Sequence, residues 1–263
     1  MSKKRPLGQN FLIDEEIARE IVELADIRPG GTVLEIGPGK GILTNYLLGK
    51  AGTFSALEID PRLIAGLEKK SRSNPKLNLI LGDALKFDYS SIGSDYQVVS
   101  NLPYYAATHI MKRLIHFRSC IRDMTLMLQK EVVDRLNASP GTKEYGSLTV
   151  FTQFNCKVER LLEIGKASFS PPPKINSALI KLTPLAKPSV DVDDQNTFFK
   201  IVHASFFHQR KMLKNNLKLL DKQLHLDESK IESSGIDLNR RAETLSLQDF
   251  ATLSNLAEPI NVK

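Results

Sequence analysis

The sequence of 263 residues predicts an α/β fold, in which a largely parallel sheet is covered by helices on both faces, with a small all-helical domain after it. Three observations lead to this prediction. Short β-branched or apolar runs alternate with helix-like segments through the first part of the chain. Closely spaced glycines follow the first of these runs directly. After Pro184 the β-branched runs stop and the pattern becomes helical.

The expected strands are short and rich in β-branched or apolar residues. Their ranges are 32–37, 53–60, 77–83, 96–101 and 124–129, with two further candidates at 157–165 and 175–184. The expected helices carry apolar residues at helical spacing. Their ranges are 14–27, 41–51, 61–73 and 107–117. Alternation of this kind indicates βαβ units and therefore a parallel sheet.

The boundary between the two expected domains lies near residue 185. The segment "LAKPSVDVDDQ" that starts there has the composition of a linker, and the residues beyond it include few β-branched ones. We therefore expect a first domain of residues 1–185 and a helical second domain of residues 186–263.

The composition argues against membrane, secreted and metal-dependent proteins. No run approaches the roughly 20 apolar residues of a membrane span, and no apolar segment follows the basic N-terminus. Cys120 and Cys156 stand alone, and the five histidines form no metal-binding pattern. We expect a cytoplasmic protein without metal or membrane association, and a monomer by default.

The net charge is +6 and the isoelectric point is near 9.2. Basic residues gather in three stretches that contain no acid, at residues 3–5, 96–122 and 197–220. A surface that binds RNA phosphates is expected to have such stretches. Solvated helix faces have the same composition, so charge alone leaves both interpretations open.

A nucleotide-type pocket is expected where the first three strands end. Gly37, Gly39 and Gly41 lie between the first strand and the next helix, where the backbone can approach a ligand closely. Glu58 closes the second strand and can bind both hydroxyls of a ribose. Asp83 closes the third strand and can reach an adenine amino group. Ligands of open α/β sheets bind beyond these strand ends.

The spacing of the glycines favours one class of cofactor over another. A dinucleotide-binding turn of the form G-x-G-x-x-G would need glycine at position 42, where Ile42 stands. The pattern G-x-G-x-G, with acids at the ends of the next two strands, suits S-adenosylmethionine better. A tight turn with two solvated acids is the structural alternative.

The sequence "NLPY" (101–104) follows the fourth strand, beside the expected pocket. The exocyclic amine of adenine is a poor nucleophile because its lone pair is delocalised into the ring. Two acceptors on its N–H groups, the Asn101 side-chain oxygen and the Leu102 carbonyl held by Pro103, would stabilise the charge that develops during methylation. Tyr104 offers a face on which a flipped-out adenine can stack. A turn whose tyrosines cap the core is the alternative.

Six motifs in order give the chain a resemblance to the ribosomal RNA adenine N6-dimethyltransferases. They are "GQNFL" (8–12), "VLEIGPGKGILT" (33–44), "EID" (58–60), "GDAL" (82–85), "NLPY" (101–104) and "FSPPPKINS" (169–177). The sequences "HQRKMLKNN" and "GIDLNRRAETLSLQDFATLSN" extend the resemblance into the tail. It implies a Rossmann-like class I methyltransferase fold, S-adenosylmethionine as methyl donor, and the small ribosomal subunit and its rRNA as partners. Residues 1–185 would then be the catalytic domain that binds S-adenosylmethionine, and residues 186–263 would bind RNA or the ribosome.

The resemblance also implies roles for single residues. Asn10, Leu12 and Gly37 would contact the methionine part of the cofactor. Asn101 would lie at the methyl end. Phe169 would face Tyr104 across the target base. Glu58 and Asp83 keep the ribose and adenine roles given above.

The activity implied is dimethylation of two adjacent adenosines in the 3′-terminal hairpin of small-subunit (16S) rRNA, during ribosome biogenesis. The nearest alternative is a large-subunit rRNA dimethyltransferase of the antibiotic-resistance type, although "NLPY" and "NRRAETLS" favour the small-subunit branch. A ribosome-assembly or transcription factor that keeps the fold without activity is a second alternative. A nicotinamide oxidoreductase is a third, against which Ile42 counts.

Overall fold

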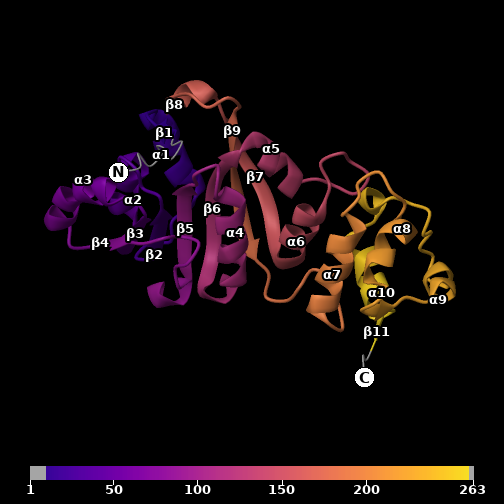
Figure 1. The fold of residues 1–263 in the computed structure, drawn as a ribbon. Helices are drawn as coiled ribbons and strands as arrows, with labels where there is room; N and C mark the ends of the chain where they lie inside the picture. Colours follow the sequence, from indigo (N-terminus) through magenta and orange to yellow (C-terminus); the bar gives the residue numbers. More distant parts are fainter. Residues whose placement is uncertain (1–9, 261–263) are drawn as a thin grey trace, which may run out of the picture. The chain divides into compact units, whose positions relative to one another are not determined.

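The structure is a computed structural model that describes residues 10–260. Its internal contacts divide the chain into two compact units (Figure 1). The first unit comprises residues 1–133 and 157–184, and the second comprises residues 134–156 and 185–263. One division between the units falls between residues 184 and 185, while residues 134–156, which we expected in the first domain, belong to the second unit. They do so because their apolar side chains contribute to the core of that unit.

A seven-stranded sheet forms the centre of the first unit, in the order β4-β3-β2-β5-β6-β9-β7. Its strands are β2 (Thr32–Ile36), β3 (Thr53–Glu58), β4 (Leu77–Leu81), β5 (Tyr96–Asn101), β6 (Ile121–Gln129), β7 (Cys156–Ile164) and β9 (Ser177–Pro184). The pairs among β2, β3, β4, β5 and β6 are parallel, and β9 is antiparallel to β6. A separate ribbon pairs β1 (Phe11–Leu12) with β8 (Phe169–Ser170). The α/β prediction is confirmed.

Helices of the first unit connect these strands. They are α1 (Glu15–Leu24), α2 (Ile42–Lys50), α3 (Pro61–Ser73), α4 (Ala107–His116) and the start of α5 (Lys130–Leu136), with 3-10 turns at Tyr89–Ile92, Arg118–Cys120 and Lys166–Ser168. Carboxylates start two of the helices. Asp14 caps α1 and accepts a hydrogen bond from Ile17 N. Asp60 caps α3, whose first residue is Pro61, and accepts a hydrogen bond from Arg62 N.

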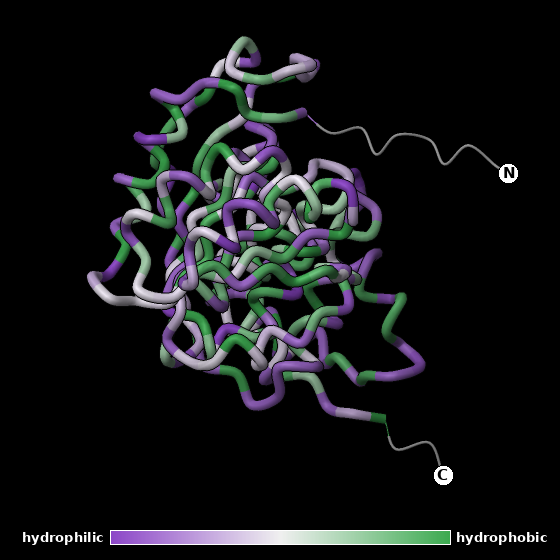
Figure 2. The backbone as a smooth tube through the Cα atoms, turned by 90° about the vertical axis from the view of Figure 1, so that its left-hand side faces the viewer, coloured by the Kyte–Doolittle hydropathy of each residue, from purple (hydrophilic) through white to green (hydrophobic). Residues whose placement is uncertain are grey.

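The sheet is buried on both faces, as a parallel sheet requires. Val33 and Val99 pack with helices α1 and α2 in one core cluster. Their neighbours Leu34 and Val98, which point to the opposite face, are equally buried. In Figure 2, hydrophilic and hydrophobic residues alternate along peripheral segments of the chain, as expected of helices with one buried face.

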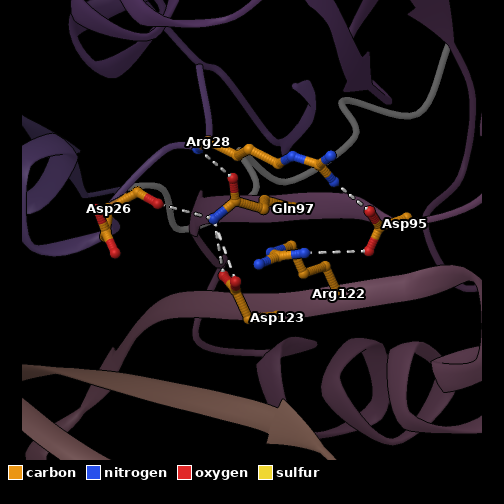
Figure 3. A network of polar contacts seen from close by, with 6 residues as sticks. All are labelled: Asp26, Arg28, Asp95, Gln97, Arg122 and Asp123. Atoms are coloured by element: carbon orange, nitrogen blue, oxygen red, sulfur yellow. Dashed lines mark hydrogen bonds and ion pairs between the residues drawn. The ribbon is translucent and has the colours of Figure 1, made fainter. Parts of the chain in front are cut away.

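A closed polar network joins the amino ends of β5 and β6 (Figure 3). The side-chain nitrogen of Gln97 donates to Asp26 O at 3.2 Å and to both carboxylate oxygens of Asp123 at 3.2 and 3.1 Å. Its side-chain oxygen accepts from Arg28 N at 2.8 Å. Gln97 and Asp123 are neighbours in the parallel register. This network ties the end of α1 to two strands, and each polar group of Gln97 has a partner.

The second unit is mainly helical. Its elements are α6 (Ser147–Asn155), α7 (Gln195–Ser205), α8 (Leu213–Leu217), α9 (Glu228–Ser233), α10 (Leu247–Asn255), 3-10 turns at Lys218–Leu220 (η4) and Ala242–Thr244 (η5), and a two-residue pair of β10 (Leu224–His225) with β11 (Glu258–Pro259). Phe154 of α6 stacks on Phe198 of α7, with ring centroids 4.6 Å apart. Aromatic packing therefore holds residues 134–156 in this unit.

Candidate active site

A cavity of about 330 Å³ opens where β2, β3 and β5 end and just beyond the end of β4. Its walls come from the segments that follow these strands and from β1. They include the predicted residues Asn10, Leu12, Gly37, Glu58, Asp83, Asn101, Leu102, Pro103 and Tyr104. Parallel strands bring distant segments to one edge of a sheet, which is why residues 48 positions apart, such as Gly37 and Leu85, line one space.

The turn after β2 is built from glycines in the left-handed region. Gly37 has φ 66°, Gly39 has φ 58° and Gly41 has φ 80°. Gly37 N donates to Leu57 O at 2.8 Å, which fixes the turn against β3. A Cβ on Gly39 would lie 3.0 Å from the ring of Phe11. Backbone conformation therefore disfavours side chains at all three glycines, and at Gly39 the Phe11 ring leaves no space for one, so the cavity keeps a wall of bare backbone.

Glu58 is held in a fixed orientation. One carboxylate oxygen accepts from Ile59 N at 2.9 Å and from Asp60 N at 3.0 Å, and the other accepts from Gly39 N at 3.3 Å. The residue is only 3% exposed. A carboxylate that is oriented in this way can accept from a diol without first losing side-chain freedom, which is what ribose binding needs.

Asp83 follows β4 and keeps part of its carboxylate open to the cavity. Its Oδ1 accepts from Leu85 N at 2.8 Å. In residues 10–260 no hydrogen bond to Oδ2 is formed. The exposed apolar side chains of Ile59 and Leu85 line the same cavity. An acceptor between apolar side chains suits a base that carries an amino group.

The corner after β5 presents two acceptors. Leu102 N donates to Met127 O at 3.3 Å, and Pro103 O accepts from Ala106 N at 3.0 Å, so both flanks of the corner are fixed. Among the residues that the structure describes, none forms a hydrogen bond with the side chain of Asn101 or with Leu102 O. Both residues line the cavity, and the two oxygens keep their acceptor capacity for a ligand.

The two tyrosines of the corner differ. Tyr104 is half-buried, and its hydroxyl lies 2.5 Å from Oγ of Ser177, a fully buried residue at the start of β9. Burial raises the pKa of the Tyr104 hydroxyl. Tyr105 also lines the cavity but is 57% exposed. The structure therefore anchors one ring and leaves the other at the surface.

Glu35 is a cavity residue that the sequence reasoning missed. It lies in β2, is 1% exposed, and its carboxylate accepts a hydrogen bond from the Thr44 hydroxyl at 2.7 Å. Burial raises its pKa to about 8, against the opposing effects of the Thr44 hydrogen bond and the charge of Lys70. An acid inside the apolar run that precedes the glycine turn was the signal that could have identified it.

Phe169 is placed differently from the other predicted residues. It pairs with Leu12 in the β1–β8 ribbon, is 2% exposed, and packs in a core cluster with Leu12, Ile164 and Leu179. It does not line the cavity that Tyr104 lines. The structure brings the other nine predicted residues together at the cavity but not Phe169, whose contact with a target base stays a prediction.

The sequence matches the ribosomal RNA adenine dimethylase family over residues 1–258. The chain belongs to this family. It is similar to the ribosomal RNA small subunit methyltransferase A of Clostridium botulinum (strain Kyoto / Type A2), with 43% identity over 252 residues, 95% of this chain and 92% of the relative. It is also 43% identical to that of Geobacillus kaustophilus (strain HTA426), over 98% of this chain and 92% of the relative.

Two solved structures of similar proteins cover nearly the whole chain. A dimethyladenosine transferase from Plasmodium falciparum has a TM-score of 0.78 and 26% identity, over 92% of this chain and 95% of that one. The 23S rRNA methyltransferase ErmE has a TM-score of 0.73 and 25% identity, over 94% and 99%. The predicted class I methyltransferase fold and the class of enzyme, an S-adenosylmethionine-dependent rRNA adenine dimethyltransferase, are confirmed.

The basic stretches expected to bind RNA in this family member prove unequal. In residues 96–122, Arg113 donates to the carbonyls of Lys86 and Phe87, Arg118 to Ile115 O, and Arg122 pairs with Asp95. Three of its guanidinium groups are thus occupied within the chain. In residues 197–220 the exposed side chains of Lys200, Arg210, Lys211 and Lys218 make no hydrogen bond or ion pair with another described residue. The third stretch, residues 3–5, lies outside the described residues.

Residues 10–260 contain no group of three or more His, Cys, Asp or Glu side chains that could hold a metal ion. In the same part of the chain, no helix has the length and apolarity needed to cross a membrane.

Proposed function

We propose that this chain dimethylates N6 of two adjacent adenosines in the 3′-terminal hairpin of small-subunit (16S) rRNA, with S-adenosylmethionine as methyl donor. Its relatives at 43% identity are named ribosomal RNA small subunit methyltransferase A. The observation that carries the proposal is the pair of free acceptors, Asn101 Oδ1 and Leu102 O, in the same cavity as Glu58 and Asp83.

The residues of the cavity fit the methyl donor. Glu58 supplies an oriented carboxylate for the ribose hydroxyls, and Asp83 supplies a free oxygen for the amino group of the adenine. The glycine turn at residues 37–41 leaves backbone exposed where the amino-acid part can approach. When bound, S-adenosylmethionine supplies an electrophilic methyl group on a positively charged sulfur.

The corner then activates the substrate. Asn101 Oδ1 and Leu102 O accept hydrogen bonds from the two N–H groups of the adenine amine, which favours a tetrahedral nitrogen and stabilises its developing positive charge. The nitrogen held by these two acceptors would take the electrophilic methyl group that the bound donor supplies. The amine then loses a proton to water. Tyr104 holds the base by stacking, with its ring fixed through Ser177.

Methyl transfer to isolated ribosomal subunits tests the proposal. Labelled S-adenosylmethionine is incubated with small subunits that lack the modification, and the RNA is digested to nucleosides. We expect N6,N6-dimethyladenosine that maps to the 3′-terminal hairpin. Large subunits from the same cells serve as the control substrate and should take no label.

A large-subunit target is the second candidate, because ErmE, a 23S rRNA methyltransferase, has a similar structure with a TM-score of 0.73. Label found only in large-subunit RNA would support it and contradict our proposal. Tight binding to small subunits without any transfer would favour an assembly factor. We also propose that the enzyme is cytoplasmic, because ribosomal subunits are its substrate, and that it is by default a monomer. Sedimentation of the purified protein tests the monomer.

A further inference from the structure

We propose that the second unit carries a separate binding groove for an unpaired nucleotide of RNA, with Phe207 as the stacking platform; this inference rests on the proposed function, because it makes rRNA the ligand. The groove has a volume of about 700 Å³ and is formed by α7, the residues after it, and η4. It lies wholly within the second unit and shares no residue with the methyl-transfer cavity.

One face of α7 forms the groove wall. Asn196, Lys200 and His203 repeat at intervals of four and three residues, which places them on one side of a helix. Phe207 continues the interval just after the helix, where its N–H donates to Ala204 O at 3.0 Å and fixes the turn. The helical repeat thus aligns two hydrogen-bonding side chains, a cation and an aromatic ring.

The apolar side chains of the groove are unusually open to water. Phe207 is 58% exposed and Leu219 of η4 is 47% exposed, although both line the groove. The ring of Phe207 lies 6.4 Å from that of His203 and 4.8 Å from that of His208. An exposed aromatic beside a second apolar side chain has the form of a site that accepts a flat, stacking ligand.

The charge around the groove selects a nucleic acid as the occupant. No carboxylate lines it, and residues 195–220 contain no acid between Asp194 and Asp221. Asp194 is turned to the start of α7, where it accepts from Asn196 N and Thr197 N. Lys200 is exposed and forms no ion pair with a described residue. A base stacked on Phe207 would therefore place its phosphate near the exposed ammonium group of Lys200, on a wall without carboxylates.

Fluorescence can test stacking directly, because the chain contains no tryptophan. The variant Phe207→Trp introduces one fluorophore in the groove, and Met212→Trp introduces one at a 44% exposed apolar position of the same acid-free stretch that does not line the groove. The probe is a single-stranded oligoadenylate. We expect its addition to quench the first variant strongly and the second weakly. Equal quenching of both variants would overturn the proposal.

Binding to small ribosomal subunits gives the second measurement, with Phe207→Ala and Met212→Ala as matched variants. Loss of one stacked base should weaken binding about tenfold for Phe207→Ala, with less than about a twofold change for Met212→Ala. The KM for subunits should rise while kcat at saturation stays unchanged. Unchanged thermal unfolding of both variants excludes misfolding.

The outcomes separate this inference from the proposed function. Quenching by oligoadenylate in a protein that methylates no small subunit would keep the groove and refute the proposed function. Methylation by Phe207→Ala with unaltered KM and affinity would refute the groove alone. Loss of subunit binding by Phe207→Ala without oligoadenylate quenching in Phe207→Trp would assign the groove to a protein partner and overturn the nucleotide proposal.

Discussion

The two ends of strand β5 each carry an amide side chain, but only one of these amides has hydrogen-bond partners within the described residues. At its amino end the amide of Gln97 is enclosed, with partners on Asp26, Arg28 and Asp123. At its carboxyl end the amide of Asn101 faces a cavity and has no partner among the described residues. One amide is used for stability and the other is kept for a ligand.

This difference follows from the cost of burying polar groups. A buried amide without partners costs about 1–3 kcal/mol. The amide of Gln97 at the amino end of β5, which we call the closed end, must therefore find its hydrogen-bond partners within the chain. The carboxyl end with Asn101 is called the open end. Figure 3 shows how the closed end is satisfied, with the outer ion pairs of Asp95 to Arg28 and Arg122 beside the Gln97 network. The open end avoids the cost because its amide stays accessible through the cavity. The accessible acceptors after β5 are therefore available for a ligand, as a site of chemistry requires.

The largest effect is expected at the open end. Asn101→Ala removes an acceptor that acts in the transition state, so turnover should fall by about 10²–10³-fold or more. The affinity for S-adenosylmethionine should stay within a few-fold. Single-turnover rates and calorimetric titration measure the two quantities, with Asn78→Ala, at an exposed position of β4, as the control. A large loss of cofactor affinity would show that Asn101 has another role.

The closed end should respond in stability and not in chemistry. Gln97→Leu leaves the buried Asp123 carboxylate without its donor, so the free energy of unfolding should fall by about 2–3 kcal/mol. The turnover number of the folded enzyme should change little. Denaturant unfolding and methyl transfer at low temperature check both. The double variant Gln97→Leu/Asp123→Leu should recover much of the loss, and a fully additive loss would contradict the network account.

Glu35 extends the comparison between the two ends of β5, because it is a buried acid that lines the cavity at the open end. Its pKa of about 8 in the folded protein exceeds the ordinary 4.5, so between these values the folded state holds a proton that the unfolded state has released. Its contribution to stability is fully present below pH 4.5 and is lost as pH rises through 8. Compared with Glu35→Gln, the wild type should lose about 2 kcal/mol between pH 6 and pH 8. Parallel pH profiles would refute the raised pKa.

The smallest effect concerns the Tyr104–Ser177 contact. Tyr104→Phe and Ser177→Ala each break the same hydroxyl pair, so each should raise the KM for subunits only a few-fold. A double-mutant cycle should give a coupling of about 0.5–1 kcal/mol, because the second substitution has nothing left to remove. Additive effects would mean that Ser177 does not position the tyrosine.

The sequence predicted the open end better than the closed end. Gly37, Glu58, Asp83 and Asn101 each follow or end an apolar strand, and parallel strand ends meet at one edge, so their proximity was predictable. The Gln97 network was not, because it joins a loop after α1 to two strands, a tertiary contact across 71 residues of sequence. Local pattern does not reveal such partners.

Other features that the sequence pattern does not reveal have related physical causes. Residues 134–156 contain a helix without a local feature that distinguishes it. Its packing in the second core, including the stack of Phe154 on Phe198, assigns it to the second unit. The guanidinium of Arg113 lies in a basic stretch for which charge alone left RNA binding and a solvated helix face open, and backbone carbonyls at Lys86 and Phe87 accept its hydrogen bonds. Phe169 lies in a motif typical of the family, but its pairing with Leu12 buries the ring. In each case a distant partner determines the position.

A crystal structure with S-adenosylhomocysteine and adenosine would test the central claim most directly. The measured quantity is the distance from the adenosine N6 atom to Asn101 Oδ1 and to Leu102 O. Our account predicts hydrogen-bond distances, about 2.7–3.2 Å, to both oxygens, with the ribose of the homocysteine ligand on Glu58. Adenosine bound elsewhere, or N6 turned away from both oxygens, would contradict the account of the open end.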